Sequence, residues 1–232
     1  MLKLEHVEIR KGEFHLKSHF DLQQGHIYAV LGPSGGGKST LLEAIAGFDP
    51  VSAGQIAWHD RSITTLPPGD RPIAMLFQDG NLFPHLTAAQ NVGLGLHPNL
   101  RLTKQDQSEI VKALSEVGLD GLADRKPAAL SGGQQARVAL ARLTVQRRDL
   151  ILLDEPFAAL GPALKAEMLA LVADLARARH ATVLMVTHEP EDARHIADQV
   201  ILVAEGQAHP PVKTQQIFDN PPPQLRDYLG QK

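Results

Sequence analysis

A glycine-rich loop that ends in lysine and serine is the clearest chemical signal in this sequence. Residues 32–40 read GPSGGGKST and match the pattern G-x-x-x-x-G-K-[ST] at Gly32, Gly37, Lys38 and Ser39. Glycines let the backbone curl so that successive N–H groups point inward around a phosphate, and a following helix N-terminus adds its positive end. The loop therefore predicts a nucleotide site, with Lys38 on the β- and γ-phosphates and Ser39 offering its hydroxyl to Mg²⁺.

The whole loop is assigned to this site. The residues predicted to contact the phosphates are Gly32, Pro33, Ser34, Gly35, Gly36, Gly37, Lys38, Ser39 and Thr40. The alternative is a glycine-rich turn that contains a lysine by chance. The apolar run IYAVL before the loop and the helical pattern after it favour the phosphate site, because this motif sits between a strand and a helix.

Two adjacent carboxylates follow another apolar run, in LILLDE at residues 150–155. In nucleotidases with this type of loop, an acid at the end of a buried strand holds Mg²⁺, which is the role we assign to Asp154. Glu155 lies one residue further and is expected to polarise an attacking water as a general base. The alternative is a surface acid pair after a strand, which the upstream glycine-rich loop disfavours.

Gln78 and His188 also terminate apolar runs, IAMLF and TVLMVT. Taken singly, each is as well explained by a strand-end polar residue that faces solvent. In a parallel sheet, however, ligands bind at the carboxyl ends of the strands, so these side chains are expected to converge with the two acids. We assign Lys38, Gln78, Glu155 and His188 to catalysis. The predicted Mg²⁺ ligands are Ser39, Gln78 and Asp154.

A second anion site is indicated by LSGGQ, residues 130–134, which precedes the helical pattern QARVALARL. Ser131, Gly132, Gly133 and Gln134 lie where a helix N-terminus exposes its N–H groups. The pattern alone is equally compatible with a serine-capped helix. One chain has no evident way to direct this site at its own glycine-rich loop.

The elements that position these residues are of two kinds. The first thirty residues alternate between apolar and polar, which is typical of half-buried antiparallel strands. Continuous apolar runs at 27–31, 73–77, 150–153, 182–186 and 200–204 are typical of a parallel sheet covered on both faces. Helical patterns between these runs predict an α/β fold: a P-loop core with a mostly parallel sheet and an N-terminal antiparallel β subdomain.

Residues 81–146 contain no convincing strand. Thr103 and Asp106 predict a helix start, and a second helix is expected from about Gly133 to Leu143. We therefore expect residues 1–232 to form one domain, with an inserted α-helical subdomain at 81–146. The nucleotide-binding core, together with the antiparallel β subdomain, comprises 1–80 and 147–232. The proline-rich tail after residue 208 is expected to be a surface extension.

Composition excludes several classes of protein. The 232 residues carry a formal net charge of −3, which does not favour a nucleic-acid partner held by bulk charge. Cysteine is absent, so there is no disulfide framework and no thiolate metal site. The start, MLKLEHVEIRKGEF, lacks the apolar region of a signal peptide, and no run reaches the roughly 18 apolar residues of a spanning helix.

Together, GPSGGGKST, the glutamine in LFQDG, LSGGQ, LILLDE and the histidine in VTHE occur in the order that resembles the ATP-binding subunit of ABC transporters. The resemblance covers essentially the whole chain, and LSGGQ is its specific part. It implies a head-to-tail dimer of two copies, with each ATP between the glycine-rich loop of one and Ser131–Gln134 of the other. It also implies ATP hydrolysis that drives an integral membrane permease.

Within this family the chain looks most like an importer ATPase. The segment MLFQDGNLFPHLTAAQNVGLGLHPNL most resembles the ATPase subunit of bacterial importers of thiamine and thiamine pyrophosphate. ATPases of polyamine, iron(III) and sulfate importers share part of it and remain the alternative, ahead of a non-transport ABC ATPase or a non-catalytic module. The importer type implies a peripheral location on the cytoplasmic face of the bacterial inner membrane. It also implies an indirect partnership with a periplasmic or surface solute-binding protein.

The resemblance also implies a surface for the permease between Gln78 and Val92. Phe83, Pro84 and Leu86 are apolar in a loop-like context and are the expected contacts. Packing inside the helical subdomain is the alternative.

Two positions depart from the family pattern. An aromatic residue that stacks on adenine is usual near position 11, where this chain has Lys11, and Phe14 is the nearest aromatic. Adenine then rests on Phe14, on a cation–π contact, or is weakly held. The second departure is Gly161, where the family pattern has an aspartate that couples the two nucleotide sites. We expect glycine to loosen the backbone there and to weaken that coupling.

Overall fold

A single sheet joins the two kinds of strand that the sequence predicts. In the computed structural model, which describes residues 1–78 and 80–230, the strand order is β5-β4-β1-β2-β10-β9-β3-β8-β7-β6, and β11 pairs with β9. The antiparallel strands are β1 (Leu2–Lys11), β2 (Phe14–Leu22), β4 (Ala53–Trp58) and β5 (Arg61–Ser62). Short β10 (Gln207–Ala208) runs parallel to β2 and antiparallel to β9, and so connects the two parts.

The predicted core strands form one parallel group. They are β3 (Ile27–Leu31), β6 (Ile73–Leu76), β7 (Leu150–Asp154), β8 (Thr182–Val186) and β9 (Gln199–Ala204). All neighbouring pairs among them are parallel, in the order β9-β3-β8-β7-β6. Their carboxyl ends consequently meet at one edge, as the sequence predicts for a site that collects strand-end side chains.

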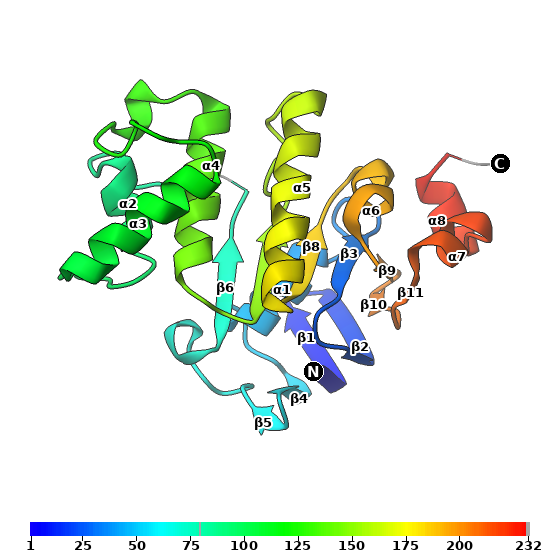
Figure 1. Cartoon of the computed structure of the whole chain (residues 1–232). Coiled ribbons are helices and arrows are strands. Elements are labelled where there is room, and N and C mark those ends of the chain that lie inside the picture. Colours follow the sequence, from blue (N-terminus) through cyan, green and yellow to red (C-terminus); the bar gives the residue numbers. More distant parts are fainter. Residues whose placement is uncertain (79, 231–232) are drawn as a thin grey trace.

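Helices cover both faces of this sheet, which explains why its strands are continuously apolar. On one face, Tyr28 and Val30 pack with α1 (Lys38–Ala46) and with the antiparallel strands. On the other, Ile151 and Leu153 pack with α4 (Gly132–Val145) and α5 (Pro162–Arg179). Figure 1 shows α5 in front of the sheet and the antiparallel strands at the bottom of the molecule.

Helices and turns make up the described residues from Gly80 to Asp149. They include α2 (Ala88–Gly93), α3 (Lys104–Glu116), the 3₁₀ turn Pro127–Ala129 and α4, which Figure 1 shows together at one end of the molecule. The predicted start of α3 is confirmed, because the Thr103 and Asp106 side chains form a reciprocal capping box. A division into core and inserted subdomain at 81 and 146 stays a prediction.

The expectation for the tail is wrong. Residues 212–228 form β11 (Val212–Lys213), α7 (Thr214–Asp219) and α8 (Pro223–Tyr228). Ile217, Phe218 and Leu225 are buried against β3, β9 and α6 (Pro190–Ile196), so the segment is part of the core. Pro222 is the N-cap residue of α8 and Pro223 its first residue, a position where the missing N–H of proline costs nothing.

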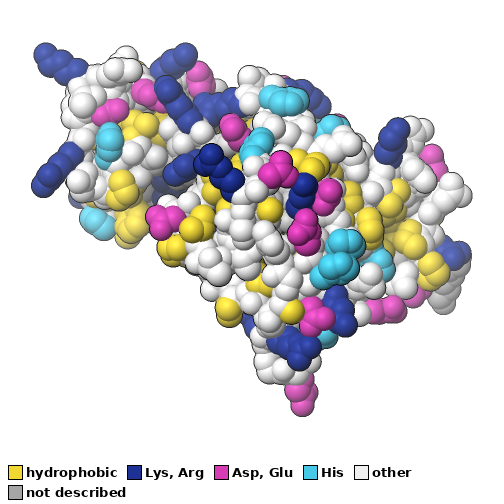
Figure 2. All heavy atoms as spheres, turned by 90° about the horizontal axis from the view of Figure 1, so that it is seen from below, with side chains coloured by type: hydrophobic (Ala, Val, Ile, Leu, Met, Phe, Trp, Pro, Cys, Tyr) yellow, Lys and Arg dark blue, Asp and Glu magenta, His cyan; other side chains and the backbone are white. Residues whose placement is uncertain are grey.

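The surface carries both positively and negatively charged side chains. Figure 2 shows one face, on which Lys and Arg side chains are interspersed with Asp and Glu. Pro68–Asp70 form a short 3₁₀ turn before β6. No helix among residues 1–78 and 80–230 is long and apolar enough to cross a membrane.

Candidate nucleotide-binding site

The glycine-rich loop connects β3 to α1, as the motif requires. Gly37 precedes the helix with φ of 102°, a left-handed conformation that non-glycine residues avoid. A Cβ on Gly37 would lie 2.5 Å from Phe14 Cζ, and one on Gly32 would lie 2.0 Å from the carbonyl oxygen of Val203. Both glycines are therefore needed for close packing of the loop against β2 and β9.

Lys38 is held inside the loop. Its ammonium donates hydrogen bonds to the carbonyl oxygens of Gly32 at 2.9 Å and Pro33 at 3.0 Å, and the residue is 4% exposed. Burial lowers the pKa of Lys38, while the charges of Glu155 and Asp154 oppose that shift. The lysine is thus a fixed cation facing the two acids.

Ser39 and Asp154 meet across the edge of the sheet. The Ser39 hydroxyl donates a 3.0 Å hydrogen bond to the Asp154 carboxylate, although the two residues lie 115 positions apart. Burial raises the pKa of Asp154, the hydrogen bond from Ser39 opposes this, and the nearby Glu155 raises it further. A hydroxyl and a carboxylate are hard oxygen donors of the type that Mg²⁺ prefers, so this pair fits the predicted metal.

Glu155 pairs with His188. Glu155 Oε1 lies in close polar contact with His188 Nε2, and the Glu155 backbone N–H donates to the carbonyl oxygen of Val186 at 3.1 Å. Glu155 has φ of 46°, an uncommon value for a non-glycine residue that is more frequent at functional sites. Glu155 follows the last residue of β7, and its carboxylate reaches His188 in the cavity beside the glycine-rich loop.

One cavity of about 280 Å³ collects most of these side chains. It is lined by Lys11, Phe14, Ser34, Gly35, Gly37, Lys38, Ser39, Thr40, Glu155 and His188. The structure therefore brings the glycine-rich loop, the acid after β7 and the histidine after β8 to one place. The remaining predicted loop residues, Gly32, Pro33 and Gly36, supply backbone to the same turn.

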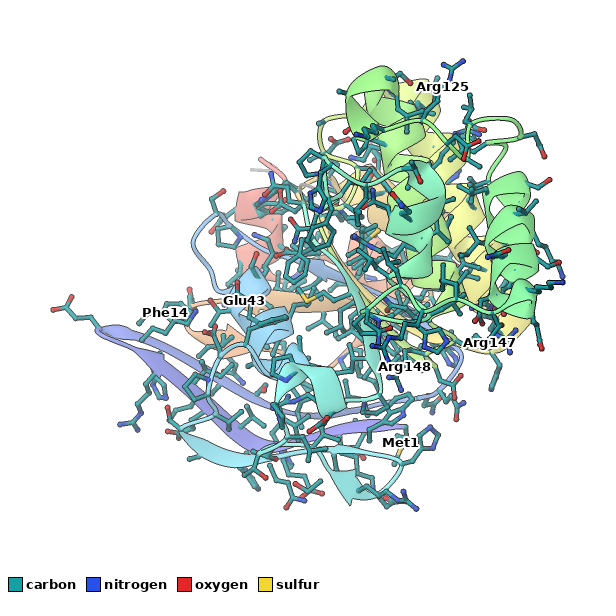
Figure 3. The ribbon with its side chains drawn as sticks, turned by 90° about the vertical axis from the view of Figure 1, so that its left-hand side faces the viewer. Met1, Phe14, Glu43, Arg125, Arg147 and Arg148 are labelled. Atoms are coloured by element: carbon teal, nitrogen blue, oxygen red, sulfur yellow. The ribbon has the colours of Figure 1, made fainter. Side chains whose placement is uncertain are left out.

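Lys11 and Phe14 differ in their availability to a base. Lys11 forms ion pairs with Asp49 and, at 3.3 Å, with Glu43 of α1. Its hydrogen bond to Asp49 raises the pKa of Lys11 above its ordinary value. Phe14 instead presents its ring to the cavity beside Gly37. Figure 3 shows Phe14 and Glu43 on the same side of the molecule, whereas Arg125 lies at the far end of the helical region.

Gln78 stands apart from the cavity lining. It is exposed in the turn after β6, whose parallel neighbour is β7 with Asp154 at its end. The chain thus brings Gln78 to the correct edge of the sheet. Its assigned contact with Mg²⁺ stays a prediction.

The LSGGQ segment lies at the N-terminus of α4 and does not line the cavity of about 280 Å³. The Ser131 hydroxyl accepts from the Gln134 N–H at 3.3 Å, and the Gln134 side chain accepts from the Ser131 N–H at 2.9 Å. Ser131 and Gly132 are exposed, whereas Gly133 is buried against Leu164. Both readings of the pattern therefore have support: the serine caps the helix, and the helix end faces outward.

Gly161 is the N-cap residue of α5, directly before Pro162. Its φ of −65° and ψ of 156° are ordinary for any residue, and a Cβ there would meet nothing within 4 Å. Glycine is therefore not required by the backbone at this position. Among the described residues, no group of three or more His, Cys, Asp or Glu could by itself hold a metal ion.

Sequence reasoning missed two residues beside the pair formed by Glu155 and His188. Lys165 forms a buried ion pair with Asp192, and Tyr228 donates a hydrogen bond to the His188 carbonyl oxygen. For Lys165 a signal existed, because it shares the apolar stripe of α5 with Met168, Leu169 and Val172. A lysine in such a stripe needs a buried partner. For Tyr228 we find no signal in the sequence.

A glycine-rich loop between a parallel strand and a helix, with a strand-end acid beside its serine, defines a P-loop nucleotidase. The family model described as ABC transporter matches residues 16–158. The chain therefore belongs to the ABC transporter family, and it carries that family's ATP-binding site.

Relatives and solved structures extend this match to nearly the full chain. A thiamine import ATP-binding protein, ThiQ, of Ruegeria sp. is 60% identical over 99% of this chain and 100% of that protein. The ThiQ of Cereibacter sphaeroides is 56% identical over the same shares. A dimeric structure of the ATP-binding cassette MJ0796, in a post-hydrolysis state bound to ADP and Pi, has a TM-score of 0.80 at 30% identity and covers 92% of this chain and 99% of that chain. The predicted family and fold class are confirmed.

Proposed function

We propose that this chain is the ATP-hydrolysing subunit of a bacterial importer for thiamine or thiamine pyrophosphate. The observation that carries the hydrolysis is the Glu155–His188 pair, which lines the same cavity as Lys38 and Ser39. The substrate rests on the relatives named thiamine import ATP-binding protein, which match this chain from end to end. ATPases of polyamine, iron(III) or sulfate importers are the alternative.

In the proposed reaction each residue has a separate task. Lys38 binds the β- and γ-phosphates, since its ammonium is already fixed at the floor of the loop. Ser39 and Asp154, with Gln78, would hold Mg²⁺, which supplies positive charge against the phosphate oxygens. Glu155 accepts the proton of the attacking water, and its pairing with His188 keeps its carboxylate in position.

The proposed reaction needs no reactant besides ATP and water. The water oxygen attacks the γ-phosphorus, and the bond between this phosphorus and the β–γ bridging oxygen breaks. ADP and inorganic phosphate are the products. The proton taken by Glu155 returns to solvent or phosphate. His188 does not change its covalent bonding in this step.

A second copy of the chain completes the proposed site. Ser131 and Gly132 expose a helix N-terminus that does not line the cavity of the same chain, and an anion is the natural ligand of such an end. We assign the γ-phosphate of ATP bound to the partner copy as that ligand. The dimeric MJ0796 cassette supports a dimer for this fold.

The proposed permease contact lies between Gln78 and Val92, in the turn at residues 81–87 that carries Phe83, Pro84 and Leu86. Phe83 is 48% exposed and Pro84 is exposed, which disfavours their packing inside the helical region. Buried Asn91 fixes this turn by accepting from the Phe83 N–H and donating to the Phe83, Leu86 and Thr87 carbonyl oxygens. Through the permease the chain would sit on the cytoplasmic face of the inner membrane, with a solute-binding protein as an indirect partner.

Reconstitution of the chain with a thiamine permease and its solute-binding protein tests the proposal. We expect ATP turnover that rises on addition of thiamine and is nearly abolished in Glu155→Gln, while ATP binding survives. Glu191→Gln is the matched control, because Glu191 is a largely exposed glutamate outside the cavity. Retained turnover in Glu155→Gln would remove this residue from its role. Stimulation by a polyamine, iron(III) or sulfate instead of thiamine would overturn the substrate assignment.

A further inference from the structure

A buried ion pair ties α5 to the segment that carries His188. Lys165 Nζ lies 2.7 Å from Asp192 Oδ2 and 2.9 Å from Glu189 Oε1. The Lys165 and Asp192 side chains are only 11% and 8% exposed, whereas that of Glu189 is 63% exposed. The pair of Lys165 and Asp192 is therefore the buried part of this contact, and Glu189 joins it at the surface.

The contact extends to both neighbours of His188 in the chain. The Thr187 hydroxyl hydrogen-bonds to the same Asp192 oxygen that receives Lys165. The Thr187 oxygen in turn accepts from the Glu189 backbone N–H at 3.1 Å. Thr187 and Glu189 are thus fixed on either side of His188, so the position of the histidine backbone depends on this network.

The network borders the catalytic pair directly. A cavity of about 50 Å³ is lined by Glu155 and His188 and also by Lys165, Thr187 and Asp192. Lys165 lies in the second turn of α5 and reaches this cavity from the helix that follows the Glu155 segment. No other lysine or arginine of the described residues lines it.

Electrostatics favour a charged, fixed lysine here. Burial lowers the pKa of Lys165, but its hydrogen bonds to Asp192 and Glu189 outweigh this, so the pKa stands above its ordinary value. Buried ion pairs add little net stability, because desolvation of both charges cancels much of their attraction. Such a pair can instead fix the position of one element relative to the other, here α5 relative to α6.

We propose that Lys165 is a positioning residue for ATP hydrolysis, which holds the Thr187–Glu189 segment so that His188 stays paired with Glu155. This inference rests on the proposed function, in which Glu155 and His188 act on the attacking water. Lys165 itself does not line the cavity that contains Lys38 and Ser39. Its loss should therefore affect the chemical step and leave nucleotide binding intact.

Steady-state ATP hydrolysis by the full chain with its permease tests this role. For Lys165→Met we expect kcat to fall by about ten- to a hundredfold with KM for ATP unchanged, because small misplacements of catalytic groups have effects of that size. Lys165→Arg keeps the charge and should recover most of kcat. Lys112→Met is the matched control, because Lys112 forms an exposed ion pair with Glu116 on α3.

A double variant separates positioning from stability. Lys165→Met with Asp192→Asn removes both buried charges but keeps an acceptor for the Thr187 hydroxyl, which limits the folding defect without restoring the fixed geometry. We expect its melting temperature to recover while kcat stays low. Recovery of kcat together with melting temperature would overturn the proposal, and so would wild-type kcat in folded Lys165→Met. If that single variant does not fold, the double variant and Lys165→Arg still give the answer.

Glu155→Gln distinguishes failure of this inference from failure of the proposed function. Loss of turnover in Glu155→Gln with wild-type kcat in Lys165→Met would overturn only the positioning role. Retained turnover in Glu155→Gln would overturn the proposed function on which that role rests.

Discussion

The Tyr228 hydroxyl donates a 2.5 Å hydrogen bond to the backbone carbonyl oxygen of His188, although the two residues lie 40 positions apart. Tyr228 is the last residue of α8, so the end of the chain reaches the segment that carries the proposed catalytic histidine. Burial raises the pKa of Tyr228, and the nearby charges of Glu155 and Glu189 raise it further. The phenol therefore stays protonated and able to donate near neutral pH.

Tyr228→Phe removes this donor and keeps the ring. We expect a loss of about 0.5–1.5 kcal/mol in stability and a decrease in kcat of less than about tenfold, because one neutral hydrogen bond is worth about that much. Thermal unfolding and ATP turnover measure the two effects. Tyr228→Leu serves as the comparison that also removes the ring. Identical behaviour of Tyr228→Phe and the wild type in both assays would show that the contact is unimportant.

Asp154 illustrates a conflict between function and stability. Because its pKa is raised in the folded chain, its favourable contribution to stability is present when it is protonated, below the unfolded value of about 3.9. That contribution is lost as the pH rises through the folded-state pKa. At neutral pH the ionised carboxylate therefore destabilises the nucleotide-free chain. Binding of Mg²⁺ and ATP would offset this destabilisation.

Asp154→Asn should consequently stabilise the nucleotide-free chain and abolish Mg²⁺-dependent hydrolysis. We expect a higher melting temperature near neutral pH, with about 2–4 °C for each kcal/mol gained in a chain of this size. The difference from the wild type should shrink as the pH falls toward the ordinary aspartate range. Asp174→Asn, at an exposed position of α5, controls for the change in net charge. A lower melting temperature for Asp154→Asn would contradict this account.

Gly161 is a second position where the chain is not at its most stable. Its N-cap geometry and the open space around it suit an aspartate, which would accept from the first N–H groups of α5. For Gly161→Asp we expect a gain of about 0.5–1 kcal/mol from capping and the helix dipole. Our sequence hypothesis adds that cooperativity in ATP rises.

Thermal unfolding and the Hill coefficient of ATP hydrolysis check these two effects of Gly161→Asp. Gly161→Ala is the control, because alanine restricts the backbone without supplying a capping oxygen. An unchanged Hill coefficient in Gly161→Asp would argue against weakened coupling in the natural chain. A lower melting temperature than that of Gly161→Ala would argue against the capping role.

The parts of the site that are contiguous in sequence could be predicted, because local patterns determine them. The loop at 32–40 follows β3 as expected, and Asp154 ends β7 as expected. Contacts such as Lys165 with Asp192, or Tyr228 with His188, depend on how α5, α6 and α8 pack. No short-range pattern specifies that packing, and for the same reason the buried face of α7 and α8 was mistaken for a surface extension.

The irregular alternation of apolar residues in β1 is also explained only by contacts with a distant part of the chain. Leu2 and Leu4 are two residues apart, whereas the next buried residue is Val7. The register of β1 against β2 shifts between Leu4 and Val7, and His6 there has φ of 48°. A bulge of this kind restores the apolar face after the break in spacing. The apolar pattern predicts a strand, but the bulge becomes evident only when the partner strand is known.

The structure favours Phe14 over Lys11 as the residue that contacts the base of the nucleotide. Both side chains line the cavity, but Lys11 is already engaged by Asp49 and Glu43, whereas the Phe14 ring is not. Stacking of a base on an aromatic ring is worth about 1–3 kcal/mol. We therefore expect Phe14→Ala to raise the Kd for ATP by about 5- to 150-fold, and Lys11→Ala to leave it nearly unchanged.

Calorimetric titration of the nucleotide into each variant measures this difference. Phe14→Leu keeps an apolar side chain against Gly37 without an aromatic face, so it separates loop packing from stacking. It should bind as weakly as Phe14→Ala if stacking matters, and Phe14→Trp should bind at least as tightly as the wild type. The assignment fails if Lys11→Ala weakens binding more than Phe14→Ala does. In that case a cationic contact with the base, and not the ring of Phe14, is what holds adenine.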